Sequence, residues 1–98
     1  MGMRRTPRPW DFPRWAETVG AMVESGCVVQ VWCDRCRVCQ RVDLVALLAK
    51  VGPDYSLCNR RCRCRLTEGC KGWNSFSYLH GVMRPLSTSE ARLRWMLG

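Results

Sequence analysis

Two short cysteine loops constrain this chain more than any other feature of its sequence. Cys33 and Cys36 are separated by two residues, and Cys64 and Cys70 are separated by five. Two such loops can supply four thiolates to one tetrahedral ion, and the closed site then ties together two distant parts of the chain. We therefore predict that the protein takes Zn²⁺ as a cofactor. The predicted ligands are Cys33, Cys36, Cys64 and Cys70.

The choice of cysteine pairs is not unique, because the chain contains eight cysteines. Cys36 and Cys39 repeat the spacing of the first loop, so the register of that loop stays open. In the second loop, Cys62 could replace Cys64. Gly69 favours a tight loop before the last cysteine, since glycine readily adopts positive φ.

Eight cysteines in 98 residues also raise the possibility of disulfides. Residues 1–14, however, are rich in arginine and proline and contain no apolar run of signal-peptide length. No stretch of the sequence approaches the length of a membrane span. We therefore expect a cytoplasmic protein without a membrane partner, in a compartment where clustered cysteines more often bind metal. Cys27 is expected in the core, and Cys58 is expected to be a spare thiol.

The pattern of apolar residues predicts a small α+β fold with a zinc-ribbon-like β-hairpin core and two or three short helices. We expect a flexible Arg/Pro arm over residues 1–14, a zinc-ribbon-like domain over 15–84 and a C-terminal helix within 85–98. Trp10, Phe12 and Trp15 could anchor the end of the arm. Helices are predicted over 16–25, 44–51 and 88–97, and strands over 27–32, 41–42 and 73–79.

Polar residues mark where two of these helices begin. Asp43 fits the N-cap of the helix over 44–51, and Gly52 is suited to end it. Ser87 and Glu90 have the spacing of a capping box, with Ser87 as the cap of the last helix.

Three motifs together resemble small, largely uncharacterised bacterial zinc-ribbon-like proteins. They are Cys33-x₂-Cys36, the Asp43-Leu44 helix followed by Gly52-Pro53-Asp54, and the segment from Arg63-Cys64 to Gly69-Cys70-x-Gly72. The second cysteine loop is also similar to those of topoisomerase zinc ribbons. The resemblance covers roughly residues 27–80. It implies a β-ribbon zinc fold, and it implies no activity.

The charge balance indicates a polyanionic partner. The chain has 16 basic residues against 8 acidic ones, and most of the basic residues are arginine, whose planar group suits phosphate and carboxylate. We therefore predict binding of DNA or RNA, with Trp73 stacking on bases and Trp32 packed in the core. The predicted nucleic-acid-binding residues flank the two cysteine loops: Arg35, Arg37, Arg41, Arg60, Arg61, Arg63, Arg65 and Lys71.

Two other functions stay open from the sequence. One is a protein-interaction adaptor, in which the arginine arm or the last helix, with Trp95, contacts an acidic protein partner. The other is a thiol redox switch at a spare cysteine whose pKa neighbouring arginines would lower. An enzyme is not expected, because His80 is the only histidine and the further parts of a catalytic group are not evident.

Overall fold

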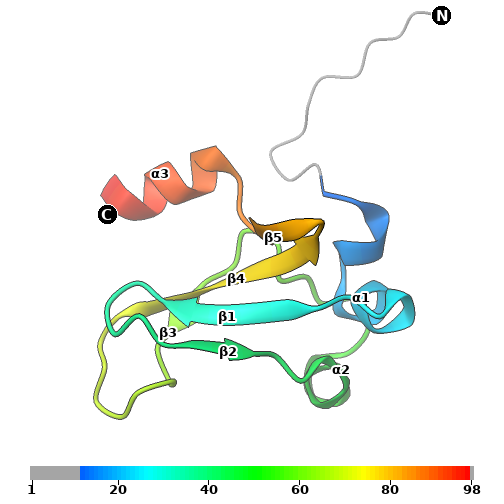
Figure 1. The fold of residues 1–98 in the computed structure, drawn as a ribbon, viewed down its shortest axis with the longest axis horizontal. Helices are drawn as coiled ribbons and strands as arrows, with labels where there is room; N and C mark the ends of the chain where they lie inside the picture. The colour runs from blue at the N-terminus through cyan, green and yellow to red at the C-terminus, as the bar shows by residue number, and fades with distance from the viewer. Residues whose placement is uncertain (1–11, 98) are drawn as a thin grey trace, which may run out of the picture.

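The fold is a small α+β arrangement, as the sequence predicts (Figure 1). The structure, a computed structural model, describes residues 12–97. Within this range, three α-helices and a short 3-10 helix accompany a five-stranded antiparallel sheet. The two cysteine loops lie at one end of the sheet, and helices α1 (Val19–Ser25) and α2 (Leu44–Val51) lie at the other end. None of the described helices has the length and apolarity needed to cross a membrane.

Two central strands, β1 (Val29–Cys33) and β4 (Trp73–His80), pair antiparallel along most of their length. Strand β2 (Cys39–Arg41) forms a hairpin with β1 around the first cysteine loop. On the other edge, β3 (Cys62–Arg63) pairs with the start of β4, and β5 (Val82–Pro85) pairs with its end. The hairpin core therefore carries the first cysteine loop at its tip.

Side chains alternate between two faces of this sheet. Within residues 12–97, helices pack on one of these faces, which we call the covered face, and the other is the open face. The covered face presents Val29 and Tyr78, which are buried. The open face presents Trp32 and Leu79, which are 38% and 43% exposed. The expectation that Trp32 packs in the core is therefore wrong. Its neighbour Cys33 points to the covered side, so Trp32 must point to the open side.

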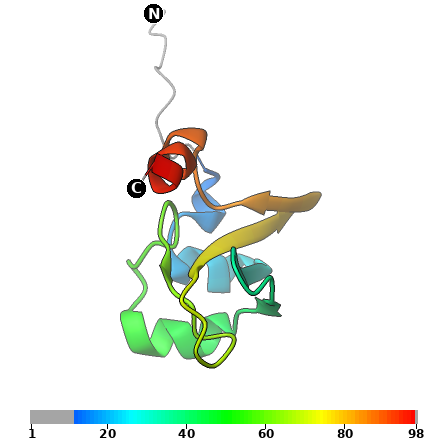
Figure 2. The same cartoon turned by 90° about the vertical axis from the view of Figure 1, so that its left-hand side faces the viewer.

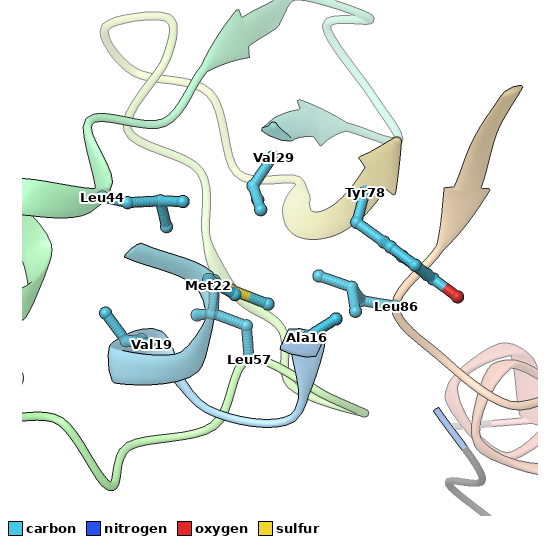
Figure 3. Close-up of a cluster of buried hydrophobic side chains, with 8 residues drawn as sticks. All are labelled: Ala16, Val19, Met22, Val29, Leu44, Leu57, Tyr78 and Leu86. Carbon is cyan, nitrogen blue, oxygen red and sulfur yellow. The ribbon is translucent and has the colours of Figure 1, made fainter. Parts of the chain in front are cut away.

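The core lies between the covered face and the helices α1 (Val19–Ser25) and α2 (Leu44–Val51). Figure 3 shows its buried side chains converging from the helices, the sheet and two loop segments. The short helix η1 (Arg14–Ala16) adds Ala16 to this cluster. The buried set is Ala16, Val19, Met22, Val29, Leu44, Leu57, Tyr78 and Leu86.

The first helix differs from its predicted range. A single helix over 16–25 was expected, but the chain breaks between η1 and α1 because Thr18 is extended. The Thr18 side chain then accepts a hydrogen bond from the Ala21 N–H at 3.1 Å and caps α1. The Val19 N–H donates to the Tyr55 carbonyl at 2.7 Å, so it does not form a hydrogen bond within a continuous helix. These contacts favour a new helix start, which the apolar spacing alone does not reveal.

The second helix begins where the sequence predicts. The Asp43 carboxylate accepts a hydrogen bond from the Ala46 N–H at 3.1 Å, so Asp43 is the N-cap of α2. Gly52 follows its last turn with φ of 90°, a value that glycine adopts without steric cost.

The last helix, α3 (Ser89–Leu97), is capped by a different residue from the one predicted. The Thr88 hydroxyl accepts a hydrogen bond from the Ala91 N–H at 3.1 Å, which is the N-cap arrangement. Ser87 is buried beside Leu86, and its hydroxyl accepts a hydrogen bond from the Arg92 guanidinium instead. The anchoring of Leu86 in the core therefore moves the helix start by one residue.

Two aromatic side chains fasten the start of the described chain to the sheet. The rings of Phe12 and Trp15 lie edge-on to Tyr78, with centroids 6.2 and 5.7 Å away. Trp10 and most of the predicted arm lie outside the described residues. At the other end of the chain, α3 lies apart from α2, as Figure 2 shows.

Candidate metal centre

The sulfur atoms of Cys33, Cys36, Cys64 and Cys70 come together at the end of the sheet. All four lie within 4.8 Å of one another. The Cys33 and Cys70 sulfurs are 3.6 Å apart, and those of Cys36 and Cys64 are 3.8 Å apart. A tetrahedral ion with metal–sulfur bonds of about 2.3 Å requires sulfurs separated by about 3.8 Å. This group therefore has the size and shape to hold one metal ion.

The first loop turns its backbone N–H groups toward sulfur. Cys33 is the last residue of β1, and its Sγ accepts hydrogen bonds from the N–H groups of Arg35 and Cys36 at 3.3 and 3.4 Å. The Cys33 N–H donates to the Val38 carbonyl at 3.1 Å and closes the hairpin. Arg37 adopts a φ of 63° in this turn. Donated N–H groups stabilise a thiolate, so the loop favours metal-binding chemistry.

The second loop repeats this arrangement at each of its cysteines. The Leu66 N–H donates to the Cys64 sulfur and the Gly72 N–H donates to the Cys70 sulfur, both at 3.4 Å. The Cys64 N–H donates to the Gly72 carbonyl at 3.0 Å and ties the two ends of the loop together. A five-residue spacing therefore brings two sulfurs to one point, because the loop closes on itself.

Asp34 locks the two loops together, a role that the sequence analysis missed. Its carboxylate accepts a hydrogen bond from the Trp73 N–H at 3.0 Å. Its own N–H donates to the Trp73 carbonyl at 3.1 Å. The only local sign of this role is an acidic residue directly after Cys33. Its hydrogen-bond partner, Trp73, is 39 residues away in the sequence.

The thiols of the cluster influence one another's ionisation. A hydrogen bond from the Thr67 side chain and one from the Val38 N–H lower the pKa of Cys36 to about 6. The Gly72 N–H lowers the pKa of Cys70, but burial and the neighbouring Cys33 thiol outweigh it and raise that pKa to about 11. Four adjacent thiolates repel one another, so full ionisation of this group calls for a bound cation.

The other described cysteines do not join the cluster. The Cys39 thiol donates to the Gln30 side chain at 3.2 Å, and Cys62 is exposed on β3. Burial raises the pKa of the thiols of Cys27, Cys58 and Cys62; Arg65 lowers the pKa of Cys62 without cancelling that effect. A raised pKa lowers the thiolate fraction of these three cysteines at neutral pH.

The cationic residues near the loops are distributed over two grooves. Arg35, Arg63 and Lys71 line the first with Trp73, in a volume of ≈ 640 Å³ that we call the tip groove. The second lies between α2 and the covered face of the sheet, has a volume of ≈ 760 Å³, and is called the α2 groove. Arg37 is exposed in the first cysteine turn. The α2 groove contains four of the predicted binding residues: Arg41, Arg60, Arg61 and Arg65.

The ring of Trp73 is already contacted by two arginine side chains. The guanidinium carbons of Arg61 and Arg63 lie 4.3 and 4.4 Å from the centre of its ring. Arg61 also lies 5.2 Å from the ring of Trp95 in α3. These contacts hold cations beside Trp73 and leave Trp32 as the more exposed of the two tryptophans near the loops.

Comparison with protein families, with curated proteins and with solved structures gave no match to this chain. Functional evidence for this chain therefore lies in the chemistry of its own sites.

Proposed function

We propose that this protein is a zinc-stapled, nucleic-acid-binding module of the zinc-ribbon type. Four convergent thiols are soft ligands of the kind that select zinc over magnesium or calcium. All four coordination positions are supplied by the chain, which is typical of a structural ion rather than a catalytic one. Zn²⁺ would hold the two cysteine loops in place, and the purified protein is expected to contain one zinc ion per chain.

The observation that carries the nucleic-acid proposal is the exposed Trp32 beside the tip groove. Trp32 lies opposite Ser75 in the sheet, and Trp73 is two residues from Ser75 on the same strand. Both tryptophans therefore point to the open face. An exposed aromatic ring next to several cations is the arrangement with which proteins bind single strands, since bases stack and phosphates pair with cations.

The proposed roles follow from these positions. Trp32 would stack on an unpaired base, while Arg35, Arg63 and Lys71 would contact phosphates along the tip groove. The Arg63 guanidinium donates to the Lys71 carbonyl at 3.2 Å, which holds it at the groove. Stacking and phosphate contacts are tolerant of sequence, so weak binding with little base selection is expected.

The test is a fluorescence anisotropy titration of a labelled single-stranded oligonucleotide at several salt concentrations. Trp32→Ala should weaken binding by roughly ten-fold, since stacking on one aromatic ring is worth about 1–3 kcal/mol. Leu79→Ala is the matched control, because Leu79 is a similarly exposed apolar residue at the far end of the open face. The control should bind like the unmodified protein.

A second variant isolates the phosphate contacts. Arg35→Ala, Arg63→Ala and Lys71→Ala together should flatten the dependence of log K on log salt by up to about two units, since each phosphate contact with a single strand contributes about 0.7. If neither single- nor double-stranded nucleic acid binds at low salt, the nucleic-acid proposal is wrong. The protein-adaptor alternative would then be favoured, since Leu93, Met96 and Leu97 are exposed on α3.

A further inference from the structure

The α2 groove is a second surface with its own chemistry. Helix α2 packs on α1, and the α2 groove lies between α2 and the sheet, toward the end that carries the cysteine loops. The floor of the α2 groove is apolar. Val31 and Phe76 contribute from the covered face of the sheet, and Leu47 and Val51 contribute from α2. All four are only partly buried, so apolar surface remains open to a ligand.

The rim of the α2 groove is strongly cationic. Lys50 and Arg65 are exposed there, and Arg41, Arg60 and Arg61 also line it. The Arg60 side chain is held in position by its Nε–H, which donates to the Ser56 carbonyl at 2.8 Å, and by the Tyr55 ring, 4.3 Å from the guanidinium. Its position is therefore set before any ligand arrives.

Among the described residues that line the groove, one carboxylate accompanies these five cations. Asp43 lines the groove, but its Oδ1 already accepts the Ala46 N–H that begins α2. The rim therefore keeps a large excess of positive charge above an apolar floor. A ligand that matches this groove must carry both carboxylate or other anionic groups and apolar side chains.

We propose that the α2 groove binds an acidic, apolar-rich peptide segment of a partner protein. Aliphatic side chains of the segment would lie on the floor, and its Asp or Glu carboxylates would pair with Lys50 and the rim arginines. Arginine suits this role because its planar group can bind a carboxylate with two parallel hydrogen bonds.

The composition of the protein's own amino-terminal segment does not match this groove. Residues 1–11 carry Arg4, Arg5 and Arg8 against the single acid Asp11, so the cationic rim would repel them. Nucleic acid is disfavoured because most of the floor is aliphatic, and the exposed tryptophan lies on the opposite face of the sheet. The inference is therefore independent of the nucleic-acid proposal.

The experiment uses three synthetic peptides of equal length with the zinc-loaded 98-residue chain. The probe peptide alternates Glu with Leu, the second replaces every Glu by Gln, and the third replaces every Leu by Ser. Binding is followed by NMR titration. The Glu/Leu peptide should bind and shift the signals of Leu47 and Phe76, and the other two peptides should bind at least several-fold more weakly.

Two double variants with equal net charge distinguish binding at the α2 groove from nonspecific electrostatic attraction of the peptide. Lys50→Glu with Arg65→Glu reverses two exposed cations on the rim, and should weaken binding of the Glu/Leu peptide by roughly ten-fold or more. Arg14→Glu with Arg94→Glu reverses two exposed cations elsewhere, and should change binding by less than about two-fold.

Several results would overturn the inference. No shift at millimolar Glu/Leu peptide means that the groove does not take such a segment. Equal weakening by both double variants means that only net charge attracts the peptide. Equal binding of the Glu/Ser peptide means that the floor is not used. Oligonucleotide binding that shifts Leu47 and Phe76 in preference to the peptide assigns the groove to nucleic acid.

Discussion

Gly72 shows how closely the two cysteine loops approach each other. A Cβ atom built at this position would lie 2.6 Å from the Arg35 Cβ, 2.8 Å from the Cys33 sulfur and 2.9 Å from the Asp34 carboxylate. These distances are shorter than real Cβ contacts, so any other residue would push the first loop away. The first loop supplies two of the four sulfurs. Replacing one Gly72 hydrogen by a methyl group would therefore disturb the metal site.

We predict that Gly72→Ala weakens zinc retention and lowers the free energy of unfolding by about 2 kcal/mol, as overpacking does. The measurements are zinc release to a colorimetric chelator and thermal unfolding. Gly26→Ala is the control. A Cβ at Gly26 meets nothing within 4 Å, but its φ of 71° is unfavourable for alanine. It should cost roughly 1 kcal/mol and leave zinc retention unchanged. Equal zinc loss in both variants would mean that Gly72 acts only through general stability.

Asp34 provides a second prediction for a single residue. Asp34→Ala removes the acceptor of the Trp73 N–H and should cost about 1–2 kcal/mol of stability, while the four sulfurs stay in place. Asp34→Asn keeps an oxygen acceptor and should recover most of that loss. Chemical denaturation with zinc bound measures both variants. If Asp34→Asn is as damaging as Asp34→Ala, the negative charge matters rather than the hydrogen bond.

Among the elements, α3 is the least firmly attached helix. It buries Ala91, while its remaining described side chains are exposed or half-buried. Its first turn is fixed by the Thr88 cap, and the Thr88 N–H donates to the Asn59 side chain at 2.7 Å. Beyond that turn, the contact between Trp95 and Arg61 links α3 to the segment before β3. Helix α2, by contrast, begins and ends on local signals at Asp43 and Gly52.

We predict that Arg61→Ala increases amide hydrogen exchange in the last turns of α3, because the Trp95 ring loses a cationic neighbour worth about 0.5–1 kcal/mol. Exchange in α2 should not change. Arg60→Ala is the matched control, since Arg60 stacks on Tyr55 and has no such contact with α3 among the described residues. Unchanged exchange in α3 would show that the Arg61 contact does not hold the helix.

At the scale of the whole molecule, the apolar core and the cysteine cluster occupy opposite ends of the sheet. Strands β1 and β4 run between them, so each end depends on the other for strand pairing. The core is small, and its largest fully buried side chains are few. A small domain of this kind is typically stabilised by a further constraint, which the proposed zinc ion would supply.

We predict that a strong chelator abolishes cooperative thermal unfolding and the dispersion of NMR signals, and that added Zn²⁺ restores both. Cys33→Ser and Cys70→Ser should each behave like the chelated protein. Cys39→Ser should not, because the Cys39 thiol lies outside the cluster. A protein that keeps its folded spectrum and its melting temperature after metal removal would show that the ion is not structural.

Much of this fold is predictable because it depends on local signals. Asp43 and Gly52 bound α2 through contacts within a few residues, and β-branched runs favour β1. The four predicted ligands are the same cysteines whose sulfurs converge in the structure. Their spacing and the nearby glycines limited the choice, although the sequence left Cys39 and Cys62 open as substitutes.

Tertiary structure decided the features that depend on contacts between residues far apart in the sequence. The direction of Trp32 follows from which face of the sheet the helices cover, and no residue near Trp32 specifies that face. Thr88 caps α3 because Leu86 is held in a core built from residues far away in the sequence. The basic residues divide between two grooves, each of which is lined by segments far apart in the sequence. Sequence determined the chemistry of the side chains, while strand pairing and packing determined which of them meet, since those contacts join residues far apart in the chain.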